Sequence, residues 1–349
     1  MRVLAAIVTN RTLDVLEPHV RSLLAQDLPR NVTLDLAYIV DGCEEDCIKL
    51  LNDAGAEVSE ALPKESGETY RVTEETHLWG LPTFAWLARE KQRLLDYAKV
   101  RHYDGVFFVD SDLILSPDTL ASLIYAEKDV TSAVFWTRWQ PKAPPLPQVW
   151  MRHPYEFEGR GLHADEFLRA LESKALMRVA GLGACTLIRS RVFDKVEWYP
   201  LLEGLPSGGM WQGEDRSFCI KAERAHVELW ADAWPDIFHQ YRPSEIARLG
   251  EWRTRLPSRA ETPCVGSWVS LVLETLEEKE LFGHREHVRG RLGALPVLRE
   301  IEKALVGMRR GEARVVKVTF PPSWSIESYR GREKSVLVRL LDVKDYVLA

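Results

Sequence analysis

The chain has 349 residues, 46% of them hydrophobic, and its 46 Lys and Arg against 52 Asp and Glu give a formal net charge of −6. This charge excludes a broadly basic nucleic-acid binder, and the 21 Gly and 19 Pro are too few for a collagen-like or low-complexity chain. At roughly 100–200 residues per domain, the length predicts about two folded domains.

Three further features bear on the compartment. The number of cysteines is odd and only Cys43 and Cys47 lie close together, so neither a disulfide framework nor a zinc ribbon is expected. Apolar residues 3–8 are followed by Thr-Asn-Arg and no small-residue cleavage site, which indicates a buried first strand rather than an export signal. No apolar run approaches the ~18 residues that cross a bilayer. We therefore expect a cytoplasmic protein without a membrane span.

Short β-branched apolar runs alternate with helical patterns over residues 1–125. Strands are predicted over residues 3–8, 34–40 and 105–109, and helices over residues 13–26, 45–54, 83–99 and 118–126. This βαβα order predicts a largely parallel sheet covered by helices, an α/β fold whose ligand site lies at the carboxyl ends of the strands.

The pattern changes twice further along the chain. Residues 138–154 are rich in proline and aromatics and predict a surface loop, after which a strand is expected over 182–188, a helix over 216–225 and a strand over 227–230. The Arg-, Pro- and Glu-rich residues 242–262 are expected to link a first domain, residues 1–250, to a second, residues 264–349. Strands at 267–273, 313–320 and 335–343 and a helix near 296–305 predict an antiparallel α+β second domain.

Four acidic or imidazole side chains are the candidates for chemistry. Asp110 and Asp112 follow a buried strand with one small residue between them, a spacing that lets both carboxylates face one divalent cation, although such triplets are also common in solvated turns. Asp215 follows Gly213 at a helix start, where it is either a general base or a simple N-cap. His239 follows a short strand and could be a third ligand, for Mn²⁺ or Mg²⁺, or an ordinary histidine.

In combination, these segments resemble the GT-A-fold glycosyltransferases, close to the family 2 type. The match rests on Thr9-Asn10-Arg11 after the first strand, Val40-Asp41-Gly42 after the second, the helix that carries Lys91, Phe107-Phe-Val-Asp110-Ser-Asp112, Ala180-Gly-Leu-Gly183, Gly213-Glu214-Asp215 and His239, over residues 1–242. The implied fold is a Rossmann-like nucleotide-diphospho-sugar transferase, and the implied activity is metal-dependent transfer of a sugar from a UDP- or GDP-sugar to a hydroxyl of a glycan, protein or small molecule.

The resemblance also implies residue roles. Thr9, Asn10, Arg11 and Asp41 are expected to contact the nucleoside, Lys91 the diphosphate, and Asp110 the ribose or the metal. Asp112 and His239 are expected to hold the metal on the diphosphate, and Asp215 to deprotonate the acceptor. Trp211, Glu214 and Trp136 are the expected acceptor-binding residues, and Trp139 and Trp150 are further rings on which a sugar could stack.

Two departures from the family pattern leave details open. Asp41 is followed by Gly42-Cys43 rather than a second Asp, so the nucleotide base stays open. Leu182-Gly183-Ala184-Cys185 and the apolar strand before the metal motif are also similar to the α-mannosyltransferases of the fungal Golgi mannan complex, which retain configuration. Inversion is favoured here, but the stereochemistry stays open.

The tail resembles the FKBP-type peptidyl-prolyl isomerases over residues 264–346. Gly307-Met308-Arg-Arg-Gly311-Glu312 and the ending from Tyr329 carry the likeness. By position Phe282, Val297, Leu298, Ile301 and Trp324 are expected to line an apolar pocket, while Gly283 stands where the family usually has Asp. We expect this domain to bind a partner or hold a homodimer, with weak isomerisation second.

Two other interpretations of the whole chain remain. A nucleotidyltransferase shares the parallel sheet and metal carboxylates but opens with a Gly-rich loop, which Thr9-Asn10-Arg11 lacks. A non-catalytic sugar- or peptide-binding protein would have no need of Asp112, Asp215 and His239 together.

Overall fold

The structure is a computed structural model that describes residues 1–64, 71–75, 77–78, 80–150, 164–203, 213–276 and 285–346. The chain divides into two compact units, Met1–Gly250 and Glu251–Ala349. Over the described ranges, no helix combines the length and the apolar character needed to traverse a bilayer.

A mixed eight-stranded sheet forms the centre of the first unit. Its spatial order is β12 (Leu176–Val179), β15 (Leu229–Asp232), β8 (Val130–Ala133), β14 (Cys185–Arg189), β6 (Gly105–Val109), β1 (Arg2–Thr9), β2 (Thr33–Val40) and β3 (Glu57–Glu60). Strands β6, β1, β2 and β3 run parallel to one another, whereas β14 is antiparallel to both of its neighbours and β12 to β15. Six of the eight strands, all except β14 and β12, therefore run in the same direction, which confirms the largely parallel sheet that the βαβα pattern predicts.

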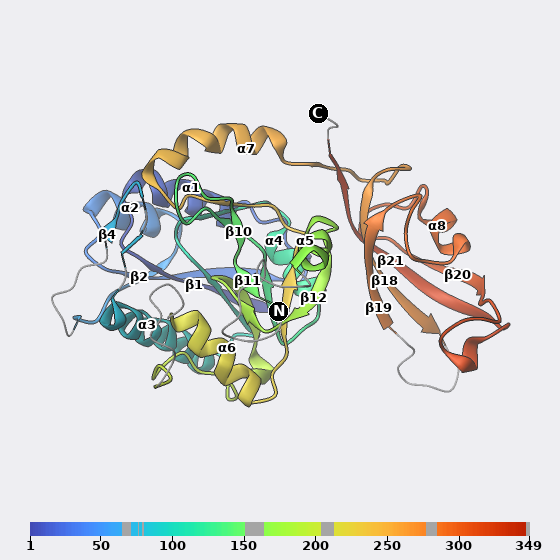
Figure 1. The fold of residues 1–349 in the computed structure, drawn as a ribbon, viewed down its shortest axis with the longest axis horizontal. Coiled ribbons are helices and arrows are strands. Elements are labelled where there is room, and N and C mark those ends of the chain that lie inside the picture. The colour runs from blue at the N-terminus through green and yellow to red at the C-terminus, as the bar shows by residue number, and fades with distance from the viewer. Residues whose placement is uncertain are drawn as a thin grey trace. The chain divides into compact units, whose positions relative to one another are not determined.

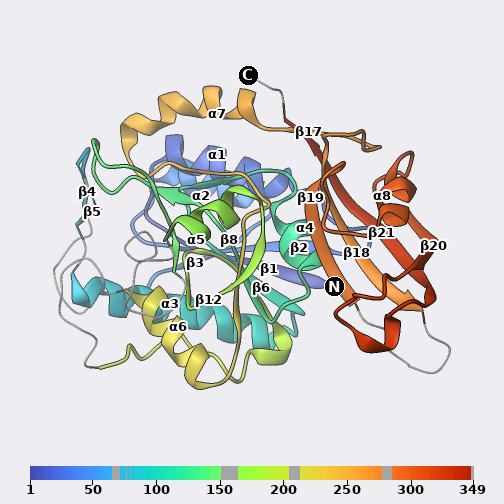
Figure 2. The same ribbon diagram turned by 45° about the vertical axis from the view of Figure 1, so that its right-hand side comes forward.

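Helices cover both faces of this sheet, which is why β6 and residues 3–8 of β1 are apolar at every position. Val3, Ala5 and Ile7 of β1 pack with α1 (Leu13–Leu24) and α2 (Glu45–Asp53), while Leu4 and Ala6 pack on the opposite side. That opposite side is covered by α3 (Leu81–Val100) and α6 (Glu214–Arg224) (Figures 1 and 2). A strand buried on both faces shows no alternation of polar and apolar residues, and this run confirms the predicted first strand.

The remaining elements of the unit are short. They are α4 (Thr119–Tyr125), α5 (Ala164–Glu172), the 3₁₀ turns η1 (Ser190–Val192) and η2 (Pro243–Arg248), and four two-stranded pairs: β4 (Arg71–Val72) with β5 (His77–Leu78), β9 (Trp136–Thr137) with β10 (Leu146–Pro147), β11 (Val149–Trp150) with β13 (Gly181–Leu182), and β7 (Leu113–Leu115) with β16 (Ile237–His239).

Two segments differ from the sequence expectations. Of the predicted surface loop over 138–154, residues 151–154 lie outside the described residues, and residues 138–150 contain β10 and β11, which pair antiparallel with β9 and β13 and leave Val149 fully buried. The expected link over 242–262 contains η2, the helix α7 (Leu249–Arg255) and β17 (Ser258–Arg259), and the division between the units falls inside α7. Five of its eight charged residues therefore sit on helical turns.

The second unit is an antiparallel sheet with one helix. Strand β21 (Glu333–Asp345) pairs with β17, with β18 (Trp268–Leu276) and with β20 (Ala313–Thr319), and β18 pairs on its other side with β19 (Arg285–Arg291). Ile301 and Leu305 of α8 (Arg299–Leu305) pack on this sheet and on the turn η3 (Glu327–Tyr329). The antiparallel α+β texture predicted for the tail is confirmed, and β19 is the strand that its sequence, rich in Arg and His, did not indicate.

Candidate active site

A cavity of about 490 Å³ lies in the first unit at the carboxyl ends of β1, β2 and β6. Because the carboxyl ends of parallel strands share one edge of a sheet, residues far apart in sequence meet there. The predicted site residues in its lining are Thr9, Asn10, Arg11, Asp41, Asp110, Asp112, Glu214, Asp215 and His239.

Three other predicted residues are placed differently. Lys91 lies beneath the cavity rather than in its lining, and Trp136 is 38% exposed outside it. Trp211 lies outside the described residues. Trp139 and Trp150 do line the cavity and offer it two indole rings.

The turn Asp110-Ser111-Asp112 follows β6 and presents its two carboxyl groups to the cavity. The Asp110 N–H donates to the carbonyl of Ala184 (3.0 Å), and the Leu113 N–H closes the turn on the carbonyl of Asp110 (3.1 Å). Burial raises the pKa of Asp110 well above its ordinary value, against the opposing charge of Lys91, and the neighbouring Asp112 raises it further. Asp110 is therefore the carboxyl group of this turn that most readily holds a proton.

Asp112 has the opposite electrostatic character. Its Oδ2 forms an ion pair with the Arg11 guanidinium and lies 3.7 Å from Nε2 of His239. Burial opposes ionisation of Asp112, but the charge of Arg11, and then His239, hold its pKa well below the usual range. The carboxylate of Asp112 is thus ionised throughout the physiological pH range, and the guanidinium of Arg11 balances its charge.

Strand pairing positions His239. In the antiparallel pair β7–β16, His239 stands opposite Leu113, next to Asp112, and the Gln240 N–H donates to the carbonyl of Asp112 (2.9 Å). The ring is oriented by Thr137, whose Oγ1 lies 2.9 Å from Nδ1. The other ring nitrogen, Nε2, faces the carboxylate side of the cavity.

A buried ion cluster joins α3 to α6 directly below the cavity. Nζ of Lys91 lies 2.8 Å from Oε1 of Glu214 and 3.0 Å from Oδ1 of Asp215, and also 4.6 Å from the centroid of the Trp198 ring. Burial lowers the pKa of Lys91, but the carboxylates of Asp215 and Glu214 outweigh it and raise that pKa above its ordinary value. Lys91 therefore stays an ammonium ion, with both carboxylates as its partners.

Asp215 is the member of this cluster that reaches the cavity. Its side chain is 27% exposed, whereas those of Lys91 and Glu214 are 4% and 8% exposed. Burial raises the pKa of Asp215 to about 6, although the charge of Lys91 opposes the shift. At neutral pH its carboxylate is ionised and still basic enough to accept a proton, which are the properties required of a general base.

Close packing explains two of the glycines before β14. A Cβ atom on Gly181 would lie 1.7 Å from the Trp150 ring, and one on Gly183 would lie 2.9 Å from the Gln148 backbone oxygen. Both contacts are too short for any larger residue. These glycines therefore allow β11 to bring Trp150 to the cavity, where the Arg216 guanidinium lies 5.2 Å from the ring centroid.

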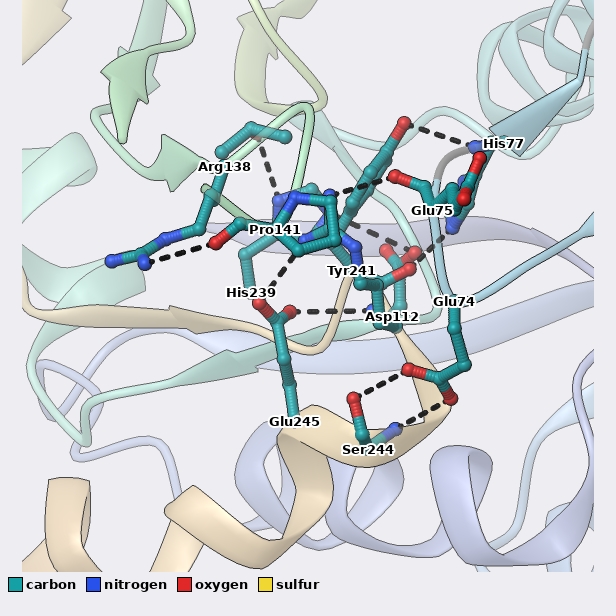
Figure 3. A network of polar contacts seen from close by, with 12 residues as sticks. Glu74, Glu75, His77, Asp112, Arg138, Pro141, His239, Tyr241, Ser244 and Glu245 are labelled. Carbon is teal, nitrogen blue, oxygen red and sulfur yellow. Dashed lines mark hydrogen bonds and ion pairs between the residues drawn. The ribbon is translucent and has the colours of Figure 1, made fainter. Parts of the chain in front are cut away.

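A short hairpin, β4–β5, is tied to the segment after His239. Glu74 accepts hydrogen bonds from the N–H (3.1 Å) and the hydroxyl (2.6 Å) of Ser244, as the dashed lines in Figure 3 show. The His77 N–H donates to the Tyr241 hydroxyl (3.2 Å), and the two rings stack with centroids 3.9 Å apart. Burial lowers the pKa of His77 to about 4, so its ring is neutral at pH 7.

Several lining residues were missed by sequence reasoning. Lys64, His77 and Trp86 line the cavity from segments without a recognisable motif, and Tyr241 does so two residues after His239. The Phe238-His239-Gln240-Tyr241 run was the only sequence signal for any of them. Lys64 and His77 carried none, because their positions depend on tertiary contacts.

The donor atoms near Asp112 can be compared with what a divalent cation needs. Among the described residues, no three His, Cys, Asp or Glu side chains are close enough together to enclose a metal ion. However, Oδ1 of Asp112 is buried, and no described donor reaches it. Two carboxylates and one imidazole are ligand types that suit Mn²⁺ or Mg²⁺. The residue types therefore fit a divalent cation, and Arg11 competes with it for the Asp112 carboxylate.

In the second unit the expected apolar pocket is described only in part. Phe282 and Gly283 lie outside the described residues. Ile301 is buried in the core, and Val297, Leu298 and Trp324 are partly buried against it. The Trp324 ring lies 5.1 Å from that of Phe320, which lies 5.0 Å from that of Tyr329.

Comparison with known proteins gives a limited result. No protein-family model and no curated protein matches the chain. Among solved structures, it is similar to S. aureus TarS 1-349 (15% identity, TM-score 0.39, 67% of this chain and 58% of that chain covered). It is also similar to the mannosyltransferase PcManGT from Pyrobaculum calidifontis in complex with GDP-Man and Mn²⁺ (15%, 0.34, 66% and 56%) and to a mycobacterial protein (14%, 0.38, 75% and 79%).

The chain thus spans 58% of the length of TarS 1-349 and 56% of that of PcManGT. At these identities and TM-scores the likenesses carry no argument about activity, which must be argued from the cavity itself.

Proposed function

We propose that the first unit is a glycosyltransferase that moves a sugar from a nucleoside diphosphate sugar to a hydroxyl acceptor. The observation that carries the proposal is one cavity holding two carboxylates whose pKa values are shifted in opposite directions. Arg11 and the Asp112 carboxylate lie at one part of the cavity, and Asp215, with a pKa raised to about 6, lies at another. A reaction that expels a diphosphate and removes a hydroxyl proton needs both parts.

The donor side of the cavity comprises the segments after β1, β2 and β6. Thr9, Asn10, Arg11 and Asp41 contact the nucleoside, and the Arg11 guanidinium also faces the diphosphate. Asp110, Asp112 and His239 hold Mn²⁺ or Mg²⁺, which, when bound, neutralises charge developing on the leaving diphosphate. The orphaned Oδ1 of Asp112 supports this assignment.

Asp215 is the proposed general base. The acceptor oxygen attacks the anomeric carbon, the bond from that carbon to the diphosphate oxygen breaks with its electron pair leaving on the diphosphate, and the hydroxyl proton moves to the Asp215 carboxylate. Lys91 holds Oδ1 of Asp215 at 3.0 Å, so Oδ2, for which no hydrogen bond from a described residue is found, is the oxygen that takes the proton. A base on the attacking side favours inversion of the sugar.

The acceptor side contains the aromatic rings. Trp139 and Trp150 line the cavity, and Trp139 meets Tyr241 edge to face with centroids 5.6 Å apart. Flat rings of this kind suit the apolar faces of a sugar. The proposed acceptor contacts also include Trp211, Glu214 and Trp136. Glu214 is included because it lies beside Asp215.

The second unit is proposed to be an FKBP-like partner-binding domain. The half-buried Trp324 ring, which packs on Phe320 beside the core residue Ile301, supports it, since such a domain offers an apolar aromatic surface to a peptide. A refolding assay on a proline-limited substrate distinguishes the roles. Turnover well below that of an FKBP enzyme supports partner binding, and full turnover contradicts it.

A panel of nucleotide sugars with Mn²⁺ tests the main proposal. We expect one donor to raise the melting temperature and to be hydrolysed slowly, and Asp112→Ala to abolish both effects. Asp53→Ala on the exposed face of α2 is the control and should change neither. If no donor in a full panel shifts the melting temperature, the proposal fails.

The same assay separates the other two interpretations. Release of pyrophosphate from a nucleoside triphosphate and a sugar phosphate would identify a nucleotidyltransferase. Tight sugar binding without any turnover would identify a non-catalytic binding protein.

A further inference from the structure

An ion pair at the cavity wall joins Asp41, a proposed nucleoside contact, to Lys64, which has been given no role so far. Nζ of Lys64 lies 2.5 Å from Oδ2 of Asp41, and the two side chains are 22% and 26% exposed. Both residues line the cavity. Asp41 directly follows β2, and its N–H donates to the carbonyl of Thr9 (2.8 Å), which fixes the carboxylate at the strand end.

The backbone that carries Lys64 is held in place by α3. Trp86 Nε1 donates to the carbonyl of Leu62 (2.7 Å), and Glu90, which is fully buried, accepts the Leu62 N–H (3.2 Å). An Arg89 N–H donates to the carbonyl of Pro63 (3.1 Å). An ordinary surface lysine has no such set of backbone contacts before it, so its position here is built by the fold.

The ammonium group itself is also held. It lies 4.5 Å from the centroid of the Trp86 ring, which adds a cation–π contact to the ion pair. The cavity wall next to it includes Phe84, Trp86 and Leu87 of α3. A flat, apolar wall beside a fixed donor and a fixed acceptor is the arrangement that recognises the edge of a planar heterocycle.

The order of donor and acceptor groups determines which heterocycle fits. The Lys64 ammonium has three N–H donors, one of which it gives to Oδ2 of Asp41, and both oxygens of the Asp41 carboxylate keep acceptor positions. An edge laid across the pair meets an ammonium donor first and then the two carboxylate oxygens. The complementary edge therefore has one acceptor followed by two donors. Guanine has this edge, with O6 as the acceptor and N1–H and the 2-amino group as the donors.

The other bases match less well. Uracil presents O4, N3–H and O2, so its second carbonyl would face a carboxylate oxygen with no proton between them. Adenine offers a donor and an acceptor but only a C–H at the third position. A misplaced lone pair against a charged carboxylate costs more than a missing contact.

We infer that the Lys64–Asp41 pair selects a guanine nucleotide as the donor of this enzyme. Lys64 donates to O6, and the two carboxylate oxygens of Asp41 accept from N1–H and the 2-amino group. The inference rests on the proposed function, because it assigns the base of the same donor.

Calorimetric titration of the full chain with GDP, IDP, UDP and ADP, with and without Mn²⁺, tests it. IDP is the informative probe, since it differs from GDP only by the missing 2-amino group. We expect GDP to bind most tightly and IDP about tenfold more weakly, because a hydrogen bond to a carboxylate is lost. This comparison uses the wild-type protein and so does not depend on any variant folding.

Two variants sharpen the test. Asp41→Asn should weaken GDP about tenfold or more and bring the ratio of IDP to GDP dissociation constants close to one. Asp53→Asn breaks the exposed Lys49–Asp53 pair, which has the same 2.5 Å separation but lies on α2 away from the cavity lining, and should leave that ratio unchanged.

The outcomes are separable. UDP or ADP binding as tightly as GDP, or an IDP to GDP ratio near one in the wild type, overturns the guanine assignment and leaves the glycosyltransferase proposal standing. If none of the four nucleotides binds, the proposed function fails and this inference fails with it.

Discussion

Replacing Lys91 by methionine probes the ion cluster beneath the cavity. Methionine keeps the length of the side chain but removes the ammonium that lies 2.8 Å from Glu214 and 3.0 Å from Asp215. At 3.0 Å, the attraction to Asp215 amounts to about 1.4 kcal/mol at a dielectric constant of ~80 and about 5.5 kcal/mol at ~20. Removing one partner of a buried ion pair typically costs about 3–5 kcal/mol. We therefore expect Lys91→Met to lose about 3–5 kcal/mol of unfolding free energy at pH 8.

The loss should depend on pH in a defined direction. The folded-state pKa of Asp215 is already about 6, above its ordinary value of 3.8, so the folded chain takes up a proton before the unfolded one. The stability from this proton is present below pH ~4 and is lost as pH rises through about 6. Without Lys91 that pKa rises further, by at least about one unit, so the deficit should shrink by about 1.4 kcal/mol or more between pH 8 and pH 5.

Thermal unfolding followed by circular dichroism at pH 8 and pH 5 measures both effects, with an expected fall in melting temperature of about 6–20 °C at pH 8. Lys174→Met is the control, because it breaks a Lys174–Asp236 pair of 2.8 Å with 17% and 23% exposure, and should cost about 1 kcal/mol. Adding Glu214→Gln and Asp215→Asn to Lys91→Met should restore most of the loss. A Lys91→Met deficit below about 1 kcal/mol, or one equal at both pH values, would refute the reasoning.

Three further outcomes are expected. Because the proposed base Asp215 has a pKa of about 6, kcat/KM should fall about tenfold per pH unit below that value, and Asp215→Asn should lower it by about 10²-fold or more. Gly181→Ala places a Cβ 1.7 Å from the Trp150 ring and should cost about 1–3 kcal/mol of unfolding free energy, or more. Arg11→Gln frees the Asp112 carboxylate, so Mn²⁺ should bind severalfold more tightly to the free enzyme in a paramagnetic titration.

Each of these outcomes has a contrary result. A kcat/KM that stays flat between pH 5 and pH 8 would show that Asp215 is not the base. Gly250→Ala is the control for packing, since nothing lies within 4 Å of its added Cβ; equal losses in both glycine variants would contradict the close approach at Gly181. Weaker Mn²⁺ binding by Arg11→Gln would show that Arg11 supports the cation instead of competing with it.

The first half of the sheet was predictable because its signal is local. The run Gly105–Val109 forms β6 with the predicted bounds, and the carboxylates after it line the cavity. Asp41 lines the same cavity because the carboxyl ends of neighbouring parallel strands share one edge of the sheet, whereas Asp215 reaches it from the start of α6 and His239 from β16, which pairs with β7. Their catalytic and metal-binding roles stay predictions.

The remaining features depend on contacts between distant segments. Lys91 was expected near a diphosphate, but its burial against α6 gives it Glu214 and Asp215 as partners, which no pattern within α3 encodes. Strand β14 runs antiparallel between β6 and β8, because the chain enters it from the β11–β13 pair rather than from a crossover helix. Lys64 is placed at the cavity wall only because side chains of α3 hold the backbone that precedes it.

The pairing of β16 with β7 links the site to the order in which the chain is made. His239 reaches Asp112 only when the last strand of the first unit has docked in register on a segment synthesised much earlier. A nascent chain that ends before β16 can form the β1–β2–β6 ladder but lacks the imidazole and the Tyr241 that packs on His77. Because contacts between distant segments form late and cooperatively, affinity for a nucleotide would report on completed folding rather than on the presence of the sheet.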